Sequence, residues 1–238
     1  MSLLEVMNVS KTYGNGCVKV YAVKNVSFKV DKGEFVAILG ESGSGKSTLL
    51  NLVGTLDVPD AGTILVDGKN IFNESLDKQA IFRRRYIGFI FQSYNLIPEL
   101  TAEQNMMFPL LLDGKMPNAI ELKTIAQILS LQERLHYYPN QLSGGQQQRV
   151  AIGRALLSKP KLILADEPTG NLDSKNSQEV ITLLKKATKE LAQTVIMITH
   201  NKTYINEVDR FFIMHDGQLF EGRKHEKLDI ASKTVKKK

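Results

Sequence analysis

Hydrophobic positions follow two patterns along the chain, and these patterns predict which segments are strands. Continuous apolar runs are typical of strands that are buried on both faces, as in a parallel sheet. Strict alternation of apolar and polar residues is typical of strands with one face exposed. The continuous runs cover residues 34–39, 86–91, 161–165 and 194–199, and the alternating stretches cover 18–30 and 62–71.

The alternating stretches predict antiparallel structure near the N-terminus. Residues 18–30 divide into two short half-buried strands. Residues 62–71 predict a hairpin, because Asp67-Gly68 is a favourable two-residue turn between alternating segments.

Helical spacing appears between the apolar runs. It predicts helices at residues 48–54, 120–131, 145–157 and 177–191. Strands that alternate with helices indicate an α/β fold around a parallel sheet. Because residues 101–157 show helical patterns and no strand, we expect a helical subdomain at about 94–157, inserted into a core made of about 1–93 and 158–222.

Charge changes this picture only at the C-terminal end. The 238 residues carry 31 basic and 25 acidic side chains, a net charge of +6, and residues 223–238 hold seven of the basic and two of the acidic ones. The folded part is therefore almost neutral, whereas nucleic-acid-binding domains have a basic face. We expect a basic tail at 223–238 and no nucleic-acid partner.

A glycine-rich loop follows the first buried strand and opens a helix. It matches G-x-x-x-x-G-K-[ST], the P-loop pattern, in which backbone N–H groups surround phosphate oxygens. Lys46 is expected to reach the β- and γ-phosphates and Ser47 to ligate Mg²⁺. The residues are Gly40, Glu41, Ser42, Gly43, Ser44, Gly45, Lys46 and Ser47, followed by Thr48 in the helix.

Two adjacent acids, Asp166 and Glu167, end the buried strand at 161–165. Carboxyl ends of parallel strands meet at one edge of a sheet, where ligands bind, so these acids are expected near the P-loop. Asp166 then suits Mg²⁺ binding through water, and Glu167 suits a general base that polarises the attacking water. An acid pair at a strand end can also simply cap the next element. The P-loop is what makes the metal-binding and catalytic interpretation of this pair strong.

A further segment, Leu-Ser-Gly-Gly-Gln at 142–146, resembles the signature of the ABC ATPase family. Other segments of the chain resemble further motifs of this family and follow in the family's order and spacing. The resemblance covers about residues 3–222. Within the family it is nearest to the branch of macrolide export and lipoprotein release, with peptide-resistance transporters and the cell-division ATPase as near relatives. By this resemblance Tyr13 stacks on adenine, and Gln92, Asp173 and His200 occupy the Q-loop, D-loop and switch positions.

The resemblance implies a P-loop NTPase core with a parallel sheet, an N-terminal antiparallel β subdomain and an inserted helical subdomain. It implies two ATP molecules held between two head-to-tail subunits. One subunit supplies Lys46, Ser47, Gln92, Asp166, Glu167 and His200, with Mg²⁺ held by Ser47, Gln92 and Asp166. The second subunit closes over the γ-phosphate with Ser143, Gly144, Gly145 and Gln146.

Partners follow from the same resemblance. No apolar run approaches the ~20 residues that a membrane span needs. The chain is therefore expected to dock peripherally on separate membrane permease subunits at the cytoplasmic face, with a periplasmic or extracellular adaptor reached through the permease. Residues 93–98, Met106, Met107 and Phe108 offer apolar surface for docking, although core packing explains the last three equally well.

Two other functions remain open from the sequence. Soluble machines with the same ATPase head are one, but they carry a long heptad insertion or two heads in one chain. Only 120 residues separate Lys46 from Asp166, and one P-loop is present. ATP-driven signalling through a membrane partner, without transport, is the other.

Overall fold

The computed structural model describes residues 1–14 and 19–223. Its centre is a six-stranded sheet in the order β5-β6-β7-β3-β8-β9. The strands are β3 (Phe35–Leu39), β5 (Ile87–Phe91), β6 (Leu162–Asp166), β7 (Thr194–Thr199), β8 (Arg210–His215) and β9 (Gln218–Glu221). All neighbouring pairs are parallel except β8 and β9, which form an antiparallel edge.

The central strands bury both faces, as their continuous apolar runs predict. Along β3, Phe35, Ala37 and Leu39 belong to one apolar cluster. Val36 and Ile38 belong to a second cluster on the opposite face. This alternation follows from the two-residue period of a strand, and it places a separate layer on each side of the sheet.

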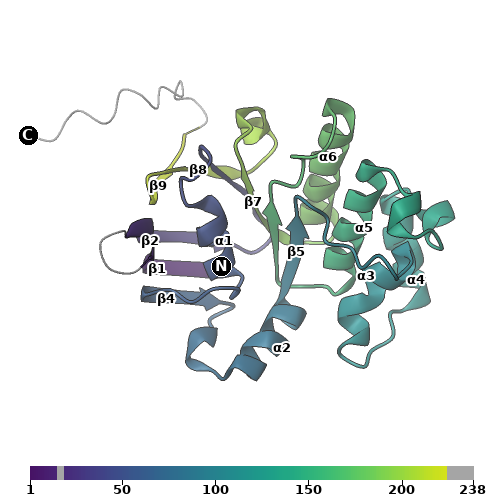
Figure 1. The fold of residues 1–238 in the computed structure, drawn as a ribbon, viewed down its shortest axis with the longest axis horizontal. Coiled ribbons are helices and arrows are strands. Elements are labelled where there is room, and N and C mark those ends of the chain that lie inside the picture. Colours follow the sequence, from purple (N-terminus) through teal and green to yellow (C-terminus); the bar gives the residue numbers. More distant parts are fainter. Residues whose placement is uncertain (15–18, 224–238) are drawn as a thin grey trace, which may run out of the picture.

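One layer is helical. It contains α3 (Ala102–Leu111), α4 (Ala119–Ile128), α5 (Gly144–Leu157) and α6 (Ser174–Glu190), whose buried residues share a cluster with the sheet. Figure 1 shows α3, α4 and α5 grouped at the far end of the molecule. Within the described residues no strand interrupts the chain between β5 and β6, so this group is one insertion between neighbouring strands.

The other layer is a second, antiparallel sheet with two helices. Its strands β1 (Ser2–Tyr13), β2 (Val20–Asp31) and β4 (Ala61–Val66) pair in the order β2-β1-β4. Helix α1 (Lys46–Val53) lies between the two sheets, and α2 (Leu76–Tyr86) runs along the lower edge (Figure 1). The α/β fold with a parallel core, an antiparallel part and helices is therefore confirmed.

Several expectations about single elements are wrong. Residues 20–31 form one continuous strand rather than two, and β1, α2, β8 and β9 are not predicted. The hairpin at 62–71 has one arm only, since β4 pairs with β1 and the return arm keeps a single bridge between Val66 and Lys69. The side chain of Asn70 then caps a short 3₁₀ helix, Ile71–Asn73, which ends the extended backbone.

The three arginines at the end of α2 hold two parts of the fold together. Arg84 and Arg85 pair with Asp113, which follows α3, and the side chain of Asp113 is only 3% exposed. Arg83 donates to the carbonyl of Thr55, after α1, at 2.9 Å. The cluster therefore connects the helical insertion to the core.

Gly153 lies in the middle of α5, where glycine disfavours a helix by ~1 kcal/mol relative to alanine. The structure gives the reason for this glycine. A Cβ here would lie 2.7 Å from Cε of Met106 and 2.9 Å from Cδ1 of Leu129. Gly153 thus allows α5 to pack closely on α3, and Met106, which is fully buried, is a core residue and offers no docking surface.

We expect Gly153→Val to lower the free energy of unfolding by ~1–3 kcal/mol, because overpacking forces neighbouring side chains out of their preferred rotamers. Denaturant titration measures the change. Ala119→Val, at the exposed start of α4, is the matched control and should stay within about 0.5 kcal/mol of the parent. Equal stability of the two variants would show that the contact with Met106 and Leu129 is loose.

Candidate nucleotide-binding site

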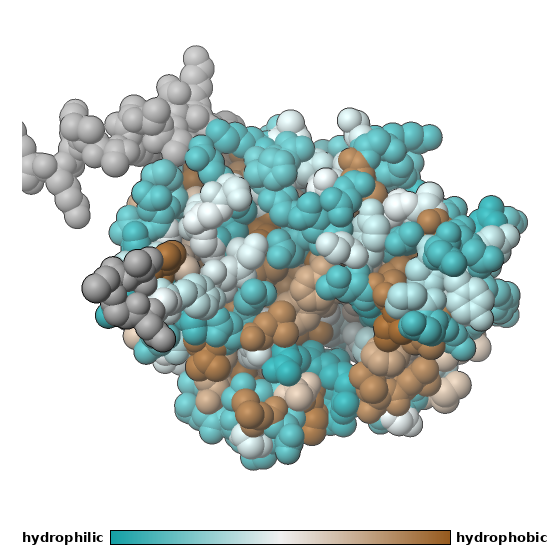
Figure 2. Space-filling model, viewed as in Figure 1, coloured by the Kyte–Doolittle hydropathy of each residue, from teal (hydrophilic) through white to brown (hydrophobic). Residues whose placement is uncertain are grey.

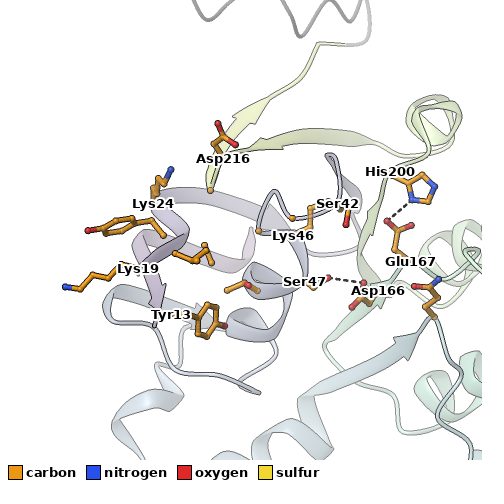
Figure 3. A pocket seen from close by; sticks show the side chains of 18 residues that line it. Tyr13, Lys19, Lys24, Ser42, Lys46, Ser47, Asp166, Glu167, His200 and Asp216 are labelled. Atoms are coloured by element: carbon orange, nitrogen blue, oxygen red, sulfur yellow. Dashed lines mark hydrogen bonds and ion pairs between the residues drawn. The ribbon is translucent and has the colours of Figure 1, made fainter. Parts of the chain in front are cut away.

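Four loops meet at the carboxyl edge of the parallel sheet. The P-loop follows β3, Gln92 follows β5, the acid pair ends β6, and His200 follows β7. They surround a cavity of about 900 Å³. Figure 3 shows Lys46, Ser47, Asp166, Glu167 and His200 around its inner part. Residues from distant parts of the sequence converge here because parallel strands end at the same edge.

The P-loop takes its shape from glycine. Gly45, at the N-terminus of α1, has φ of 105°, and a Cβ at this position would lie 2.1 Å from the carbonyl oxygen of Ala22. No side chain caps the helix, so its first N–H groups remain available at the cavity. A helix N-terminus with free N–H groups favours a bound anion.

Lys46 bends back over its own loop. Its ammonium group donates to the carbonyl oxygens of Gly40 and Glu41 at 2.9 and 2.8 Å. Burial lowers the pKa of Lys46 from the ordinary lysine value, and the negative charges of Glu167 and Asp166 oppose this effect. A phosphate that entered the cavity would offer Lys46 a charged acceptor in place of two neutral carbonyls, which makes stronger hydrogen bonds.

Oxygen atoms suited to a magnesium ion lie on one side of the loop. The Ser47 hydroxyl is 3.5 Å from Oδ1 of Asp166, and Gln92 lines the same cavity. Hydroxyl, carboxylate and amide oxygens are the ligands that Mg²⁺ prefers, usually together with water and substrate phosphate. Burial and the neighbouring charge of Glu167 raise the pKa of Asp166, although Ser47 and Lys46 oppose them. A bound cation would remove this penalty, so the residues fit the ion.

Glu167 is positioned by its backbone and by His200. Its φ is 44°, a left-handed conformation uncommon for a residue with a side chain, and its N–H donates to Ile198 of β7. Oε1 lies 3.0 Å from Nδ1 of His200. Oε2 is buried and has no hydrogen-bond partner among the described residues. An unpartnered carboxylate oxygen in this cavity is suited to accept a hydrogen bond from a water molecule.

Gln92 is held by an amide pair. Its Nε2 donates to Oδ1 of Asn171 at 3.2 Å, and Nδ2 of Asn171 donates to the carbonyl of Gln92 at 3.0 Å. This places the loop after β5 beside the segment that precedes α6. Two residues further on, Tyr94 and Asn95 have left-handed backbones, and both carbonyls accept hydrogen bonds from Arg154 of α5.

The segment Ser143–Gln146 does not line the cavity. Ser143 is the N-cap of α5, where its hydroxyl accepts from the N–H of Gln146 and the Gln146 side chain accepts from the N–H of Ser143. Asp173 is also outside the cavity and caps α6 through the N–H of Asn176 at 2.8 Å. The structure of one chain therefore brings the P-loop side together and leaves Ser143, Gly144, Gly145, Gln146 and Asp173 outside the cavity.

The remaining predicted residues divide in a simple way. Tyr13, Ser42, Gly43, Gly45 and Thr48 line the cavity, whereas Gly40 and the buried Ser44 do not. The sequence reasoning missed the outer wall, which contains Lys19, Val20, Tyr21, Ala22, Lys24, Asp216 and Gly217. Backbone bonds tie this wall to the P-loop, since Lys24 donates to Gly217 and Gly217 donates to Ser44. The sequence does carry a signal for the turn in this wall, because Asp216-Gly217 between β8 and β9 is a two-residue hairpin turn of the same kind as Asp67-Gly68.

We expect Tyr13→Ala to weaken ATP binding by roughly one to two orders of magnitude, because stacking between a base and an aromatic ring contributes ~1–3 kcal/mol. Tyr13 is 40% exposed at the outer rim of the cavity (Figure 3), where a base would lie if the phosphates sat on the P-loop. Calorimetric titration measures the affinity. Unchanged affinity would place the base elsewhere.

Comparison with known proteins identifies the family of the chain. The sequence model of the ABC transporter family matches residues 23–170. The lipoprotein-releasing system ATP-binding protein LolD of Shewanella frigidimarina is 43% identical over 220 residues, 92% of either chain. The macrolide export ATP-binding/permease protein MacB of Bdellovibrio bacteriovorus is 40% identical over 236 residues, 99% of this chain and 36% of that protein.

Among solved structures, an ATP-binding cassette in a dimeric, post-hydrolysis state bound to ADP and Pi aligns with a TM-score of 0.83 and 41% identity. The alignment covers 94% of this chain and all of the cassette.

Proposed function

The chain belongs to the ABC transporter family of ATP-binding proteins, and we propose that it is the Mg²⁺-dependent, ATP-hydrolysing subunit of a transporter that works as a dimer around two ATP molecules. One observation carries the proposal. The cavity gathers the residues expected to bind phosphate and activate water, whereas the signature segment Ser143–Gln146 lies outside it on the same chain. A second subunit is then needed to complete each site.

The bound nucleotide extends along the cavity from Tyr13 to His200. Tyr13 stacks on adenine, the P-loop N–H groups and Lys46 hold the phosphates, and Ser47, Asp166 and Gln92 hold Mg²⁺. The ion supplies charge that stabilises the negative phosphate oxygens during transfer. Glu167 accepts a proton from the attacking water through its unpartnered oxygen, and His200 holds the other oxygen in place.

The second subunit contributes its signature segment to the γ-phosphate. Ser143 is the N-cap of the 14-residue helix α5, so the helix dipole adds to the N–H groups of Gly144 and Gly145. Tyr94, on the loop after Gln92, lies against Gly144, because a Cβ on this glycine would be 2.9 Å from the tyrosine hydroxyl. Movement of the Gln92 loop is thereby passed to the signature segment of the same chain. Asp173 acts at the same dimer interface.

Force is passed to membrane permease subunits that are separate chains. Among the described residues, no helix is both long and apolar enough to span a bilayer. Figure 2 shows apolar side chains along the lower edge, over α2 and the α3–α4 region. The exposed apolar residues of these elements are Leu76, Ile81, Leu111, Leu112, Met116 and Ile120. They provide a docking surface at the cytoplasmic face of the membrane.

The cargo is of the kind moved by the macrolide-export and lipoprotein-release branch and its near relatives, namely an antibiotic, a peptide or a lipoprotein. An adaptor outside the membrane binds to the complex through the permease. The second candidate is ATP-driven signalling through the membrane partner without cargo, and it uses the same cavity and docking surface. The basic tail at 223–238 lies outside the described residues, apart from Arg223.

Purification of the tagged full chain from detergent-solubilised membranes tests the proposal. A polytopic membrane protein should co-purify, and reconstitution with it should raise ATP turnover. Ile120→Glu, on the docking surface, should reduce co-purification, whereas Lys123→Glu, on the same helix, is the matched charged control. A chain that purifies alone and hydrolyses ATP at the same rate with and without membrane proteins would contradict the transporter role.

A further inference from the structure

The hydroxyl of Tyr13 is not free in the solvent. It donates a hydrogen bond to Oδ2 of Asp57 at 2.6 Å, and the two residues are 44 positions apart. Tyr13 ends β1, whereas Asp57 lies in the loop that leads from α1 to β4. The aromatic ring at the cavity rim is therefore held by the segment that follows the P-loop helix.

Asp57 is itself fixed. Oδ1 accepts hydrogen bonds from the ammonium of Lys11 at 2.8 Å and from the N–H of Val58 at 2.7 Å. The ammonium also donates to the Val58 carbonyl at 2.7 Å. Only 13% of the Lys11 side chain and 27% of the Asp57 side chain are exposed. Both oxygens of the carboxylate are thus occupied, and the group has no freedom to turn.

The pKa values of Asp57 and Tyr13 both favour the phenol as the donor and the carboxylate as the acceptor. Partial burial alone would raise the pKa of Asp57, but the hydrogen bonds from Lys11 and Tyr13 outweigh it and hold the pKa below its ordinary value. Burial and the bond to Asp57 raise the pKa of the Tyr13 phenol, although the Thr48 hydroxyl and Lys11 oppose them. At neutral pH the phenol is the donor and the carboxylate is the acceptor.

The same lysine also occupies one face of the tyrosine ring. Its ammonium lies 5.3 Å from the ring centroid, within the range of a cation–π contact. Both restraints on the ring therefore come from one cluster, with Asp57 at the hydroxyl and Lys11 over a face. Tyr13 also lines the cavity and is 40% exposed, so ring surface remains accessible to a flat partner.

We propose that Asp57 is a positioning residue for nucleotide recognition, which locks the Tyr13 ring through Lys11 and its own carboxylate so that a purine base stacks on a preformed platform. The inference rests on the proposed function, since it needs the base at Tyr13. Its physical basis is preorganisation, because a ring that is already immobile loses less conformational freedom when the base binds. The cluster thus contributes to affinity for nucleotides and not to affinity for phosphate chains.

A purely structural role makes a different prediction. In that case the cluster would only tie β1 to the α1–β4 loop. Removing it would then disturb the P-loop helix, and every ligand that contains phosphate would be affected. Inorganic tripolyphosphate separates the two roles, because it has the phosphates of ATP and no base.

The experiment measures binding of Mg-ATP and Mg-tripolyphosphate to the full chain by calorimetry. Asp57→Ala and Tyr13→Phe should each weaken ATP binding by roughly three- to tenfold, the share of the stacking contact that depends on a fixed ring. Neither should change binding of tripolyphosphate. The double variant should be no weaker than the weaker single variant, since both changes break one hydrogen bond. Asp57→Asn keeps an acceptor for the phenol and should restore most of the affinity.

Two controls accompany these variants. Glu5→Ala removes a carboxylate that pairs with Lys29 at 2.7 Å on the same antiparallel sheet, and it should leave both ligands unaffected. In steady-state hydrolysis, Asp57→Ala should raise the KM for ATP by the same factor as the dissociation constant while kcat is retained.

Three results would overturn the inference. They are an equal loss for ATP and tripolyphosphate, an unchanged affinity for ATP in Asp57→Ala, and additive losses in the double variant. Failure of the proposed function looks different, because Tyr13→Ala would then bind ATP like the parent. If Tyr13→Ala binds ATP weakly and Asp57→Ala binds it like the parent, the base stacks on Tyr13 but Asp57 does not position the ring.

Discussion

A Glu167→Gln chain is expected to bind ATP normally, to lose hydrolysis by ~10²–10⁴-fold and to accumulate as a closed dimer, because a general base is removed while its shape is kept. Glutamine retains the size of the side chain and a hydrogen-bond acceptor, yet it cannot take the proton of the attacking water. Lys46, Ser47 and Asp166 remain, so the nucleotide and its ion are still held. The reaction then stops after closure and before chemistry.

Mass measurement by light scattering, with and without ATP, detects the accumulated dimer, and phosphate release measures the rate. Asp166→Asn serves as the comparison, since it weakens the ion site and should reduce dimer formation as well as turnover. Glu133→Gln, an exposed acid in the helical insertion, is the inert control. A Glu167→Gln protein that turns over ATP at the parent rate, or stays monomeric with ATP at every salt concentration, would remove Glu167 from the role of base.

The sequence predicts the parallel core well because continuous apolar runs leave few alternatives. Residues 194–199 form β7 with the predicted bounds, 34–39 and 86–91 each lose their first residue, and 161–165 moves by one residue to 162–166. Each run is buried on both faces, so burial pattern and strand assignment agree. The carboxyl ends of these strands then bring the P-loop, the acid pair and His200 together, a juxtaposition that follows from sheet topology.

Prediction fails where pairing partners decide the structure. The β1 segment mixes polar and apolar residues across several bulges, and its extended form depends on β2 and β4 on either side. Helix α2 has few apolar positions and is fixed by its contacts, among them Arg84 and Arg85 with Asp113. The short strands β8 and β9 form an edge hairpin that only the completed sheet stabilises.

Several contacts within the site are not predicted from the sequence for the same reason. Chain order gives no sign that Asp57 reaches Tyr13 or that Asn171 pairs with Gln92, because each contact joins loops from different strands. The signature segment is recognised from its residues, yet its distance from the cavity of its own chain becomes visible only in the structure. This separation has a direct experimental consequence at Ser143.

Ser143→Arg is expected to leave ATP binding near the parent value and to abolish detectable turnover. The side chain is exposed at the N-cap of α5 and is not part of the cavity in its own chain, so first contact with ATP does not need it. In the closed dimer it would meet the γ-phosphate of the partner's nucleotide. An arginine there adds bulk and removes the cap, which blocks the close approach of the helix N-terminus.

Loss of a helix cap costs about 0.5–2 kcal/mol by itself, so the effect on turnover has to be separated from an effect on stability. Thr101→Arg is the matched control, because Thr101 and Gln104 form the same capping box at the start of α3. Both variants should lose similar stability in thermal unfolding, but only Ser143→Arg should stop hydrolysis. ATP turnover at the parent rate in Ser143→Arg, or an equal loss in Thr101→Arg, would contradict a site shared between two subunits.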